Sequence, residues 1–288
     1  MGEQKHRIAL LTDSTCDIPP DYVKQYDIFV VSQYVIWGTE ELRDMIDIDP
    51  RSFYERLVKE PVSPKTSQPV VSDFVRTLER ARDEGAEEAV IIVISNQLSG
   101  TILSARQAKE MVDIPVHVVD SLSTSMGLGW QVLAAARARE AGGDAQAMIA
   151  AADKTRQTMQ VIFSVDTLEY LHRGGRIGGA AKLVGTALQL KPQLYVDHAT
   201  GRVEPGERTR TRKKALKRVY EVFFENMDTS KPMHIAVLHS AAEEEATGIY
   251  ERIREEYEPV ELLMGNVTPV IGTHTGPGAI GIVGYYET

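Results

Sequence analysis

The feature that most constrains this chain is a run of six consecutive apolar residues, Ala89 to Ile94, which leads directly into a polar turn and then a helix-like pattern. A short apolar run bounded by turn residues predicts a buried strand. The turn, residues 95–101, contains Ser99, Gly100 and Thr101. A polar turn after a buried strand lies at the carboxyl end of an α/β sheet, where ligands usually bind. This stretch therefore predicts both a fold class and the place of a binding site.

Two roles remain open for the hydroxyls of Ser99 and Thr101. Free backbone N–H groups and the positive end of the helix dipole meet at the start of the following helix, so an anion can bind there with help from either hydroxyl. The same hydroxyls can instead cap the helix and contact no ligand. The local sequence favours neither role over the other.

The order of strand, hydroxyl-bearing turn and helix recurs in the first half of the chain. A β-like run from Arg7 to Thr12 leads into residues 13–17, where we favour local Asx and Ser/Thr turns over ligand contacts. A strand from Val116 to Val119 leads into the second such turn, residues 120–125. Strands that alternate with helices in this way predict a parallel sheet covered on both faces. A proline-rich loop, residues 61–69, cannot be helical and presents Thr66 above this sheet.

The second half of the chain predicts a mixed sheet with helices on one face. We expect Asp166 to cap a helix that ends at residues 172–176, a further helix to about Leu188, and Thr209 to open a helix to Asn226. Residues 197–201 predict the loop of a β-hairpin. The fold class is therefore α/β, with an N-terminal α/β/α domain containing a parallel sheet in residues 1–158 and a C-terminal two-layer α/β domain with a mixed sheet in residues 159–288.

Composition narrows the class of protein. The chain has 288 residues, of which 43% are hydrophobic and 25% charged, which is typical of a soluble protein with one large or two medium domains. A single cysteine, Cys16, excludes an internal disulfide framework and indicates a reducing compartment. The only apolar run near the N-terminus is too short for a signal peptide, so we expect a cytoplasmic protein. A net charge of −9 argues against general nucleic-acid binding.

The sequence lacks the motifs of several common nucleotide-binding, hydrolase and metal sites. Residues 276–281 fit the pattern G-x-G-x-x-G, but they lead into a β-like run, whereas a dinucleotide fingerprint needs a helix there. No P-loop and no G-x-S-x-G nucleophile elbow is present. The seven histidines lack metal-binding spacing, and the paired acids Asp44 and Asp47 have no further ligand at a suitable spacing. We therefore expect neither a metal nor a cofactor.

Two polar stretches remain unexplained by these exclusions. His274 is surrounded by threonines and glycines that let a ligand approach the backbone, which favours a functional role over the structural role more common for a single histidine. Arg173 and Arg176 flank Gly174 and Gly175, in a turn that could also be an ordinary helix C-cap.

The whole chain resembles the DegV family of bacterial fatty-acid-binding proteins. Each matching motif is weak by itself, and together, in the expected order, they are specific. The matching stretches are Leu11-Thr12-Asp13-Ser14-Thr15-Cys16-Asp17, Lys65-Thr66-Ser67-Gln68-Pro69, Leu98-Ser99-Gly100-Thr101, Asp120-Ser121, His172-Arg173-Gly174-Gly175-Arg176 and Gly272-Thr273-His274-Thr275-Gly276-Pro277-Gly278.

This resemblance implies two α/β domains, forming one unit over about residues 7–286, with a long-chain fatty acid such as palmitate between them. It implies that the carboxylate is held near Thr66, Ser99 and His274. The better-studied members are non-enzymatic carrier subunits of a fatty acid kinase, whose separate kinase subunit phosphorylates the bound acid. The alternative is a binding subunit or enzyme acting on a small carbonyl compound, because the family fold resembles the substrate domain of dihydroxyacetone kinases. The residues expected to support the carboxylate site are Gly100, Thr101, Ser121, Arg176 and Thr275.

The residues expected at the site are chemically suited to a fatty acid as the ligand. A buried carboxylate needs several hydrogen-bond donors, and hydroxyls with a protonatable histidine provide them without a permanent cation. We expect Arg176 to orient His274 or a phosphorylated head group rather than to contact the tail. At about 0.8 kcal/mol per buried methylene group, a chain of fourteen such groups contributes about 11 kcal/mol before ordering costs.

The segment from Arg202 to Arg218 carries eight basic residues in an acidic chain. We expect Arg208, Arg210 and Arg212 to belong to a docking face for an acidic kinase partner. Two alternatives remain open, a solvated helix face that only keeps the protein soluble and a transient contact with an anionic membrane.

Overall fold

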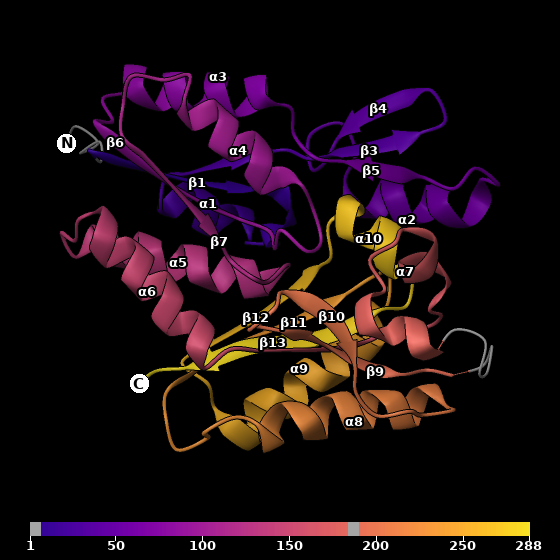
Figure 1. Cartoon of the computed structure of the whole chain (residues 1–288). Coiled ribbons are helices and arrows are strands. Elements are labelled where there is room, and N and C mark those ends of the chain that lie inside the picture. Colours follow the sequence, from indigo (N-terminus) through magenta and orange to yellow (C-terminus); the bar gives the residue numbers. More distant parts are fainter. Residues whose placement is uncertain (1–6, 184–189) are drawn as a thin grey trace.

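The computed structural model describes residues 7–183 and 190–288. A four-stranded parallel sheet forms the centre of the N-terminal half, in the order β2-β1-β6-β7. Helices lie on both of its faces, as Figure 1 shows. The predicted α/β class with a parallel sheet is therefore confirmed. The strands are β1 (Ile8–Asp13), β2 (Ile28–Val31), β6 (Glu88–Val93) and β7 (Val116–Asp120).

The alternation of side chains along β6 explains why its sequence is apolar at every position after Glu88. Ala89, Ile91 and Val93 pack into one core cluster, beneath α3 (Val71–Asp83) and α4 (Thr101–Lys109). The residues between them, Val90, Ile92 and Ile94, pack into a second cluster that contains α5 (Met126–Glu140) and α6 (Ala145–Gln157). Successive side chains of a strand point to opposite faces, so a strand buried on both faces needs a continuous apolar run.

The C-terminal half contains a six-stranded sheet in the order β10-β9-β8-β13-β11-β12. Only the β11–β12 pair is parallel, so the predicted mixed sheet is confirmed, as is the hairpin around residues 197–201. Helices α8 (Arg212–Glu225) and α9 (Glu243–Tyr257) cover its outer face. The strands are β8 (Gln160–Ser164), β9 (Gln193–Asp197), β10 (Arg202–Pro205), β11 (Met233–His239), β12 (Glu261–Asn266) and β13 (Ile280–Tyr286).

Helices α5 and α6 lie between the two sheets and are shared by both (Figure 1). Trp130 on α5 is fully buried, and its indole N–H donates to the carbonyl of Val283 on β13 over 3.3 Å. A Cβ atom at Gly129 would lie 2.5 Å from the carbonyl oxygen of Cys16, so glycine lets α5 approach the N-terminal half closely. One core cluster therefore contains residues from both halves of the chain, and the predicted division after residue 158 stays a prediction.

A small antiparallel sheet, in the order β4-β3-β5, is an addition that the sequence did not predict. Residues 32–33 separate β2 from β3, and these two neighbouring strands belong to different sheets. Strand β5 lies within the proline-rich loop and carries Thr66. The elements of this region are β3 (Tyr34–Trp37), β4 (Glu40–Arg43), β5 (Lys65–Ser67) and α2 (Pro50–Lys59), and the short helices before it are η1 (Ser14–Cys16) and α1 (Pro20–Gln25).

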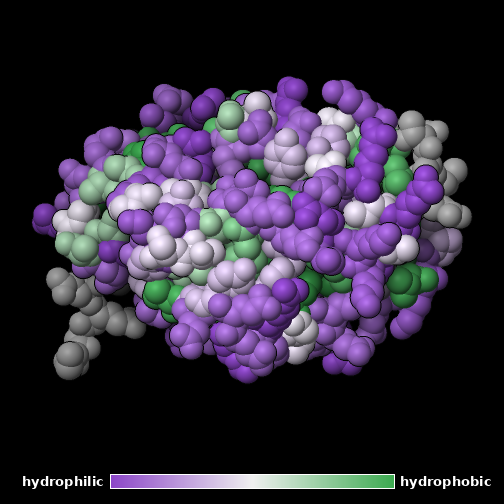
Figure 2. Space-filling view, turned by 90° about the horizontal axis from the view of Figure 1, so that it is seen from below, coloured by the Kyte–Doolittle hydropathy of each residue, from purple (hydrophilic) through white to green (hydrophobic). Residues whose placement is uncertain are grey.

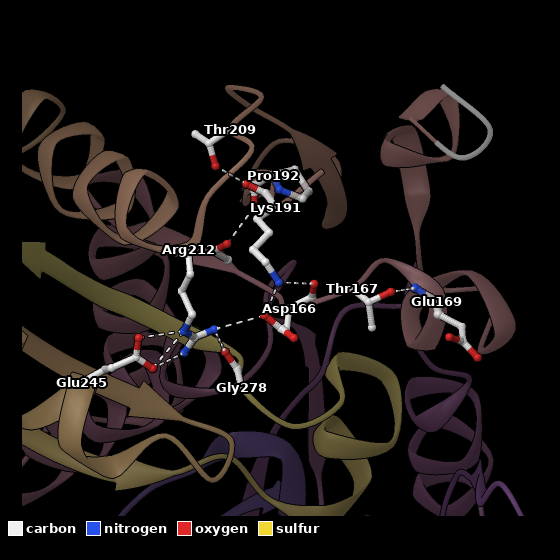
Figure 3. A network of polar contacts seen from close by, with 10 residues as sticks. Asp166, Thr167, Glu169, Lys191, Pro192, Thr209, Arg212, Glu245 and Gly278 are labelled. Carbon is white, nitrogen blue, oxygen red and sulfur yellow. Dashed lines mark hydrogen bonds and ion pairs between the residues drawn. The ribbon is translucent and has the colours of Figure 1, made fainter. Parts of the chain in front are cut away.

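Two predicted helix caps were wrong. Asp166 does not cap α7 (Glu169–Arg173), because it binds Lys191, and the hydroxyl of Thr167 accepts the Glu169 N–H instead (Figure 3). Thr211 rather than Thr209 caps α8. The helix expected to reach about Leu188 is a 3-10 helix over Gly178–Leu183, and its predicted remainder lies outside the described residues. Both cap errors exchange one short polar side chain for another nearby, and by local criteria either could have capped the helix.

Seen from the side of α8 and α9, the surface is mostly hydrophilic, with apolar residues in small separate patches (Figure 2). Across residues 7–183 and 190–288, no helix is both long and apolar enough to cross a membrane.

The two-sided burial of β6 predicts a large cost for truncating it. We expect Ile92→Ala to lower the free energy of unfolding by about 2–5 kcal/mol, because it removes fully buried apolar atoms and leaves a cavity. Chemical denaturation measures this change. The control Val58→Ala, at a side chain that is 68% exposed, should change the same quantity by less than about 0.5 kcal/mol. Equal effects of the two substitutions would contradict the burial of β6 on both of its faces.

Candidate ligand-binding cavity

A cavity of about 300 Å³ lies between the inner face of the C-terminal sheet and the polar turns that follow β1 and β6. This volume is within the range of small-molecule sites. Helix α10 (Pro269–Thr275) contributes both polar and apolar residues to the lining, and apolar side chains of the C-terminal sheet form much of the remaining wall. The polar lining includes Thr66, Ser67, Gln68, Ser99, Arg176, His274 and Thr275, and the apolar lining includes Val161, Phe163, Val196, Leu238 and Val283.

The structure brings Thr66, Ser99 and His274 to this one cavity. Thr66 Oγ1 lies 2.9 Å from Nε2 of His274, although 208 residues separate them in the sequence. Ser99 Oγ lies 2.8 Å from Thr101 Oγ1 and accepts the N–H of Thr101 over 3.3 Å. Ser99 therefore forms the expected local bond at the start of α4 and also faces the cavity.

The supporting residues divide into two groups. Gly100, Arg176 and Thr275 line the cavity. Thr101 is fully buried behind Ser99 and reaches the cavity only through that hydroxyl. Ser121 does not reach it, because its hydroxyl bonds the carbonyl and N–H of Ser123 within its own turn.

Gly100 allows the two polar segments to meet. A Cβ atom at this position would lie 1.9 Å from the side-chain oxygen of Gln68. Gln68 follows β5 and donates to the hydroxyl of Ser104 on α4 over 3.0 Å. Glycine therefore lets the segment that carries Thr66 approach the turn that carries Ser99.

Arg176 joins the two halves of the chain beside the cavity. Its Nε donates to the carbonyl of Leu98 over 2.9 Å, and its Nη1 donates to the carbonyl of Gly174 over 2.7 Å. A Cβ atom at Gly174 would lie 2.1 Å from Nδ1 of His274, so the turn packs directly against the imidazole. Arg176 thus fixes the backbone that supports His274 and makes no direct bond to the ring.

The electrostatics of the cavity differ from the sequence expectation. Burial, together with repulsion from the charge of Arg176, lowers the pKa of His274 to about 4, so the imidazole is neutral at pH 7. Its Nδ1 is buried and has no hydrogen-bond partner among the described residues. Arg176 carries the permanent charge at the cavity wall. The expectation of a protonatable histidine without a permanent cation is therefore corrected: the cation is Arg176.

His274 lies on a helix that sequence reasoning missed. The glycines around it indicated a loop, but α10 begins at Pro269, at a position where proline is favoured, and ends at Thr275 before Gly276, whose φ is +70°. Gly272 lets α10 approach α2, because a Cβ atom there would lie 2.5 Å from the Tyr54 hydroxyl oxygen. The Thr268-Pro269 pair is the signal that could have revealed this helix.

Two carboxyl groups of the N-terminal half bind the start of α10. Asp17 Oδ1 accepts the N–H of Thr268 over 3.0 Å, and Asp44 Oδ1 accepts the N–H of Val270 over 3.2 Å. Asp17 also accepts the hydroxyl of Ser125, and Asp44 accepts that of Ser14 over 2.6 Å. These acids were not predicted site residues, because their partners lie in distant segments of the chain.

Burial sets the titration of these acids. It raises the pKa of Asp44 to about 8 and that of Asp17 to about 7, and the two negative charges also repel each other. Asp47, by contrast, lies at the surface, where Arg43 holds its pKa at about 2. Asp44 and Asp47 therefore have separate partners, and no group of three or more potential metal ligands occurs within the described part of the chain.

The arginines of the basic segment, residues 202–218, differ in their surroundings in the structure. Arg212 binds Glu245 through two nitrogens, donates to the carbonyl of Gly278 and lies 3.7 Å from Asp166 (Figure 3). Arg208 and Arg210 are exposed and have no ion pair with any described residue. Of the three arginines expected to dock a partner, Arg212 is therefore held within the protein.

Comparison with known proteins identifies relatives over nearly the whole chain. A family model described as "Uncharacterised protein, DegV family" matches residues 7–287. Protein DegV of Bacillus subtilis is 36% identical over 277 residues, which are 96% of this chain and 98% of that protein. Its crystal structure, described as that of a fatty acid binding protein, has a TM-score of 0.90 and covers 98% of this chain and 100% of the other.

Two further solved structures are similar. A DegV family protein from Thermus thermophilus, whose description names fatty acid binding, is 36% identical with a TM-score of 0.90, and covers 98% of this chain and 100% of its own. A stearic acid-binding protein from Eubacterium ventriosum is 26% identical with a TM-score of 0.87, and covers 97% of this chain and 98% of its own. The fold described above is therefore one that fatty-acid-binding proteins share.

The raised pKa of Asp44 predicts a pH-dependent stability. The folded protein holds a proton that the unfolded chain, with a carboxyl pKa of about 3.9, releases. Stability from this group therefore falls as the pH rises from about 4 to about 8. Asp44→Asn keeps an oxygen acceptor for Val270 and loses the titration, so the free energy of unfolding of the variant should fall less steeply across this window.

Asp47→Asn is the matched control. The pKa of Asp47 is lowered, so the stability that it contributes is lost only as the pH falls toward about 2, and its substitution should leave the slope between pH 4 and 8 unchanged. Denaturant titrations at a series of pH values measure both slopes. A slope in Asp44→Asn equal to that of the unmodified protein would show that Asp44 does not titrate as its burial requires.

Proposed function

The chain belongs to the DegV family, and from this membership and the shape of the cavity we propose that it binds one long-chain fatty acid between its two halves. The observation that carries the proposal is the lining of the cavity, which combines many apolar side chains with a smaller set of hydroxyl, amide, imidazole and guanidinium groups. A fatty acid has both kinds of surface, an apolar tail and a single polar head. A small polar carbonyl compound would leave the apolar walls uncovered, so the geometry disfavours the dihydroxyacetone-kinase-like alternative.

In this proposal the carboxylate lies against Thr66, Ser99 and His274. When the imidazole proton is on Nε2, His274 donates to Thr66 Oγ1, and the hydroxyl proton of Thr66 is then free for the ligand. A buried carboxylate is stable only when such donors satisfy its oxygens. The charge of Arg176 further favours an anion in this part of the cavity. Thr275 and the backbone of Gly100 complete the polar wall.

We further propose that the protein is a carrier rather than an enzyme, and that a separate kinase phosphorylates the bound carboxylate. The sequence contains no P-loop, the glycine-rich loop with which many phosphoryl-transfer proteins cradle the phosphates of a nucleotide. Charge attraction would bring such a kinase to the basic segment, where Arg208 and Arg210 are exposed. Transient contact of the same arginines with an anionic membrane is the competing explanation.

The carboxylate site makes a direct prediction. Protein purified from a bacterial host should carry the mass of a long-chain acid in native mass spectrometry. The double variant Ser99→Ala with His274→Ala should lower the affinity for hexadecanoate by at least about tenfold, since the charge-assisted contact from Ser99, about 1.5 kcal/mol or more, is lost and the Thr66 hydroxyl no longer has the imidazole that orients it. Thr66→Val, which keeps the side-chain shape, should weaken binding by a smaller factor.

Ser121→Ala is the matched control for these variants. It removes a buried serine hydroxyl of the same loop system that does not line the cavity. Its affinity for hexadecanoate should equal that of the unmodified protein. If the double variant also bound with full affinity, the assignment of the carboxylate site would be wrong, and absence of any acid from the unmodified protein would refute the proposed function.

The docking face gives a kinetic prediction. Reversing Arg208 and Arg210 to glutamate should slow formation of acyl phosphate by the cognate kinase, most strongly at low salt, because salt screens charge attraction. Affinity for free hexadecanoate should not change. The control Lys24→Glu with Lys231→Glu makes the same change in net charge at exposed positions outside the segment. Equal rates for both double variants across a salt series would show that the segment does not dock a kinase. If reversal of Arg208 and Arg210 weakened only the binding to anionic vesicles, the segment would be a membrane contact instead.

A further inference from the structure

The glycine motif at residues 276–281, which leads into β13 rather than into a helix, ends inside the cavity. Its last glycine, Gly281, is the second residue of β13 and lines the cavity wall. Val283, two residues further along the strand, lines the same wall. Alternate residues of a strand share a face, so both positions belong to the inner face of the C-terminal sheet.

Gly281 lies between two large side chains in one row across the sheet. In the strand register it pairs with Leu238 on β11 and with Phe163 on β8. Both neighbours also line the cavity. Directly paired residues project from the same face, so a position without a side chain between a leucine and a phenylalanine leaves a trough in the wall.

The backbone does not require glycine at this position. Gly281 is not among the residues with positive φ, and an added Cβ atom would lie 3.2 Å from Cβ of Phe163 and 3.4 Å from the carbonyl oxygen of Ile162. These contacts are tight, but they are not prohibitive. Gly284 on the outer face differs, because a Cβ atom there would lie 2.5 Å from the carbonyl oxygen of His234. Close packing therefore explains why residue 284 is a glycine. At Gly281, by contrast, the space beside the glycine is part of the cavity.

We propose that Gly281 determines ligand length: the trough between Leu238 and Phe163 is a tail subsite that receives part of the acyl chain. The inference rests on the proposed binding of a fatty acid. A glycine inside a strand often marks a place where a ligand approaches the backbone closely. A side chain at this position occupies the trough and leaves fewer methylene groups of the tail in contact with the wall.

The test is the dependence of affinity on chain length, measured with even-numbered saturated acids from octanoate to octadecanoate. Each further buried methylene group strengthens binding until the cavity is filled, after which affinity stops rising. In Gly281→Val we expect this plateau to begin at an acid at least two carbons shorter, with hexadecanoate bound roughly tenfold more weakly than by the unmodified protein. Gly281→Ala, a smaller change, should shift the plateau in the same direction.

Two further variants separate a filled trough from a distorted strand. Val283→Ala enlarges the same wall and should move the plateau toward longer acids. Ile282→Val alters the neighbouring buried residue on the outer face and should lower stability without moving the plateau. An unchanged plateau in both Gly281 variants, with affinity lowered equally for every acid, would overturn the inference. Failure of the unmodified protein to bind any acid would instead refute the proposed function.

Discussion

The hydrogen bonds from the start of α10 to Asp17 and Asp44 are the contacts on which the cavity most depends. By sequence α10 belongs to the C-terminal half, between β12 and β13, but its first N–H groups are bound by carboxyl groups of the N-terminal half. These N–H groups have no partner within the helix itself, so a buried helix start requires such acceptors. The acids therefore fix where the helix that carries His274 lies relative to Thr66.

The layered core explains why a cavity exists beside this helix. Helices α5 and α6 fill the space between the two sheets and pack on both. Ile94 and Leu238 belong to this shared core and also line the cavity, so the cavity continues the apolar interior where the helices no longer fill it. Its apolar wall is thus a by-product of how the sheets pack. Its polar side chains have several origins: Thr15 and Ser99 follow parallel strands at their carboxyl ends, where ligands usually bind in α/β proteins, whereas Thr66 lies on β5 and His274 on α10.

Sequence reasoning found the parts of this arrangement that local patterns encode. The apolar run of β6 predicted a buried strand, and the turn after it predicted a polar group at the sheet edge, and both are confirmed. It could not find contacts between distant segments. Asp17 is 251 residues from Thr268 and Asp44 is 226 residues from Val270, so no periodicity or spacing connects them. The small β4-β3-β5 sheet was missed for a related reason, since three residues of β5 inside a proline-rich loop carry too little pattern to predict a strand.

The charged groups around the cavity are placed so that they repel an anionic ligand only weakly. Thr15 and Ser125 line the cavity, and behind them their hydroxyls donate to the buried acids Asp13 and Asp17. Burial raises the pKa of both acids, so they are protonated more readily than surface carboxyl groups. Protonation removes the negative charge that would otherwise repel a carboxylate ligand, and a ligand that brings its own negative charge favours the protonated forms further. The hydroxyls of Thr15 and Ser125 therefore lie between the cavity and the two buried acids, while Arg176 contributes a positive charge at the cavity wall.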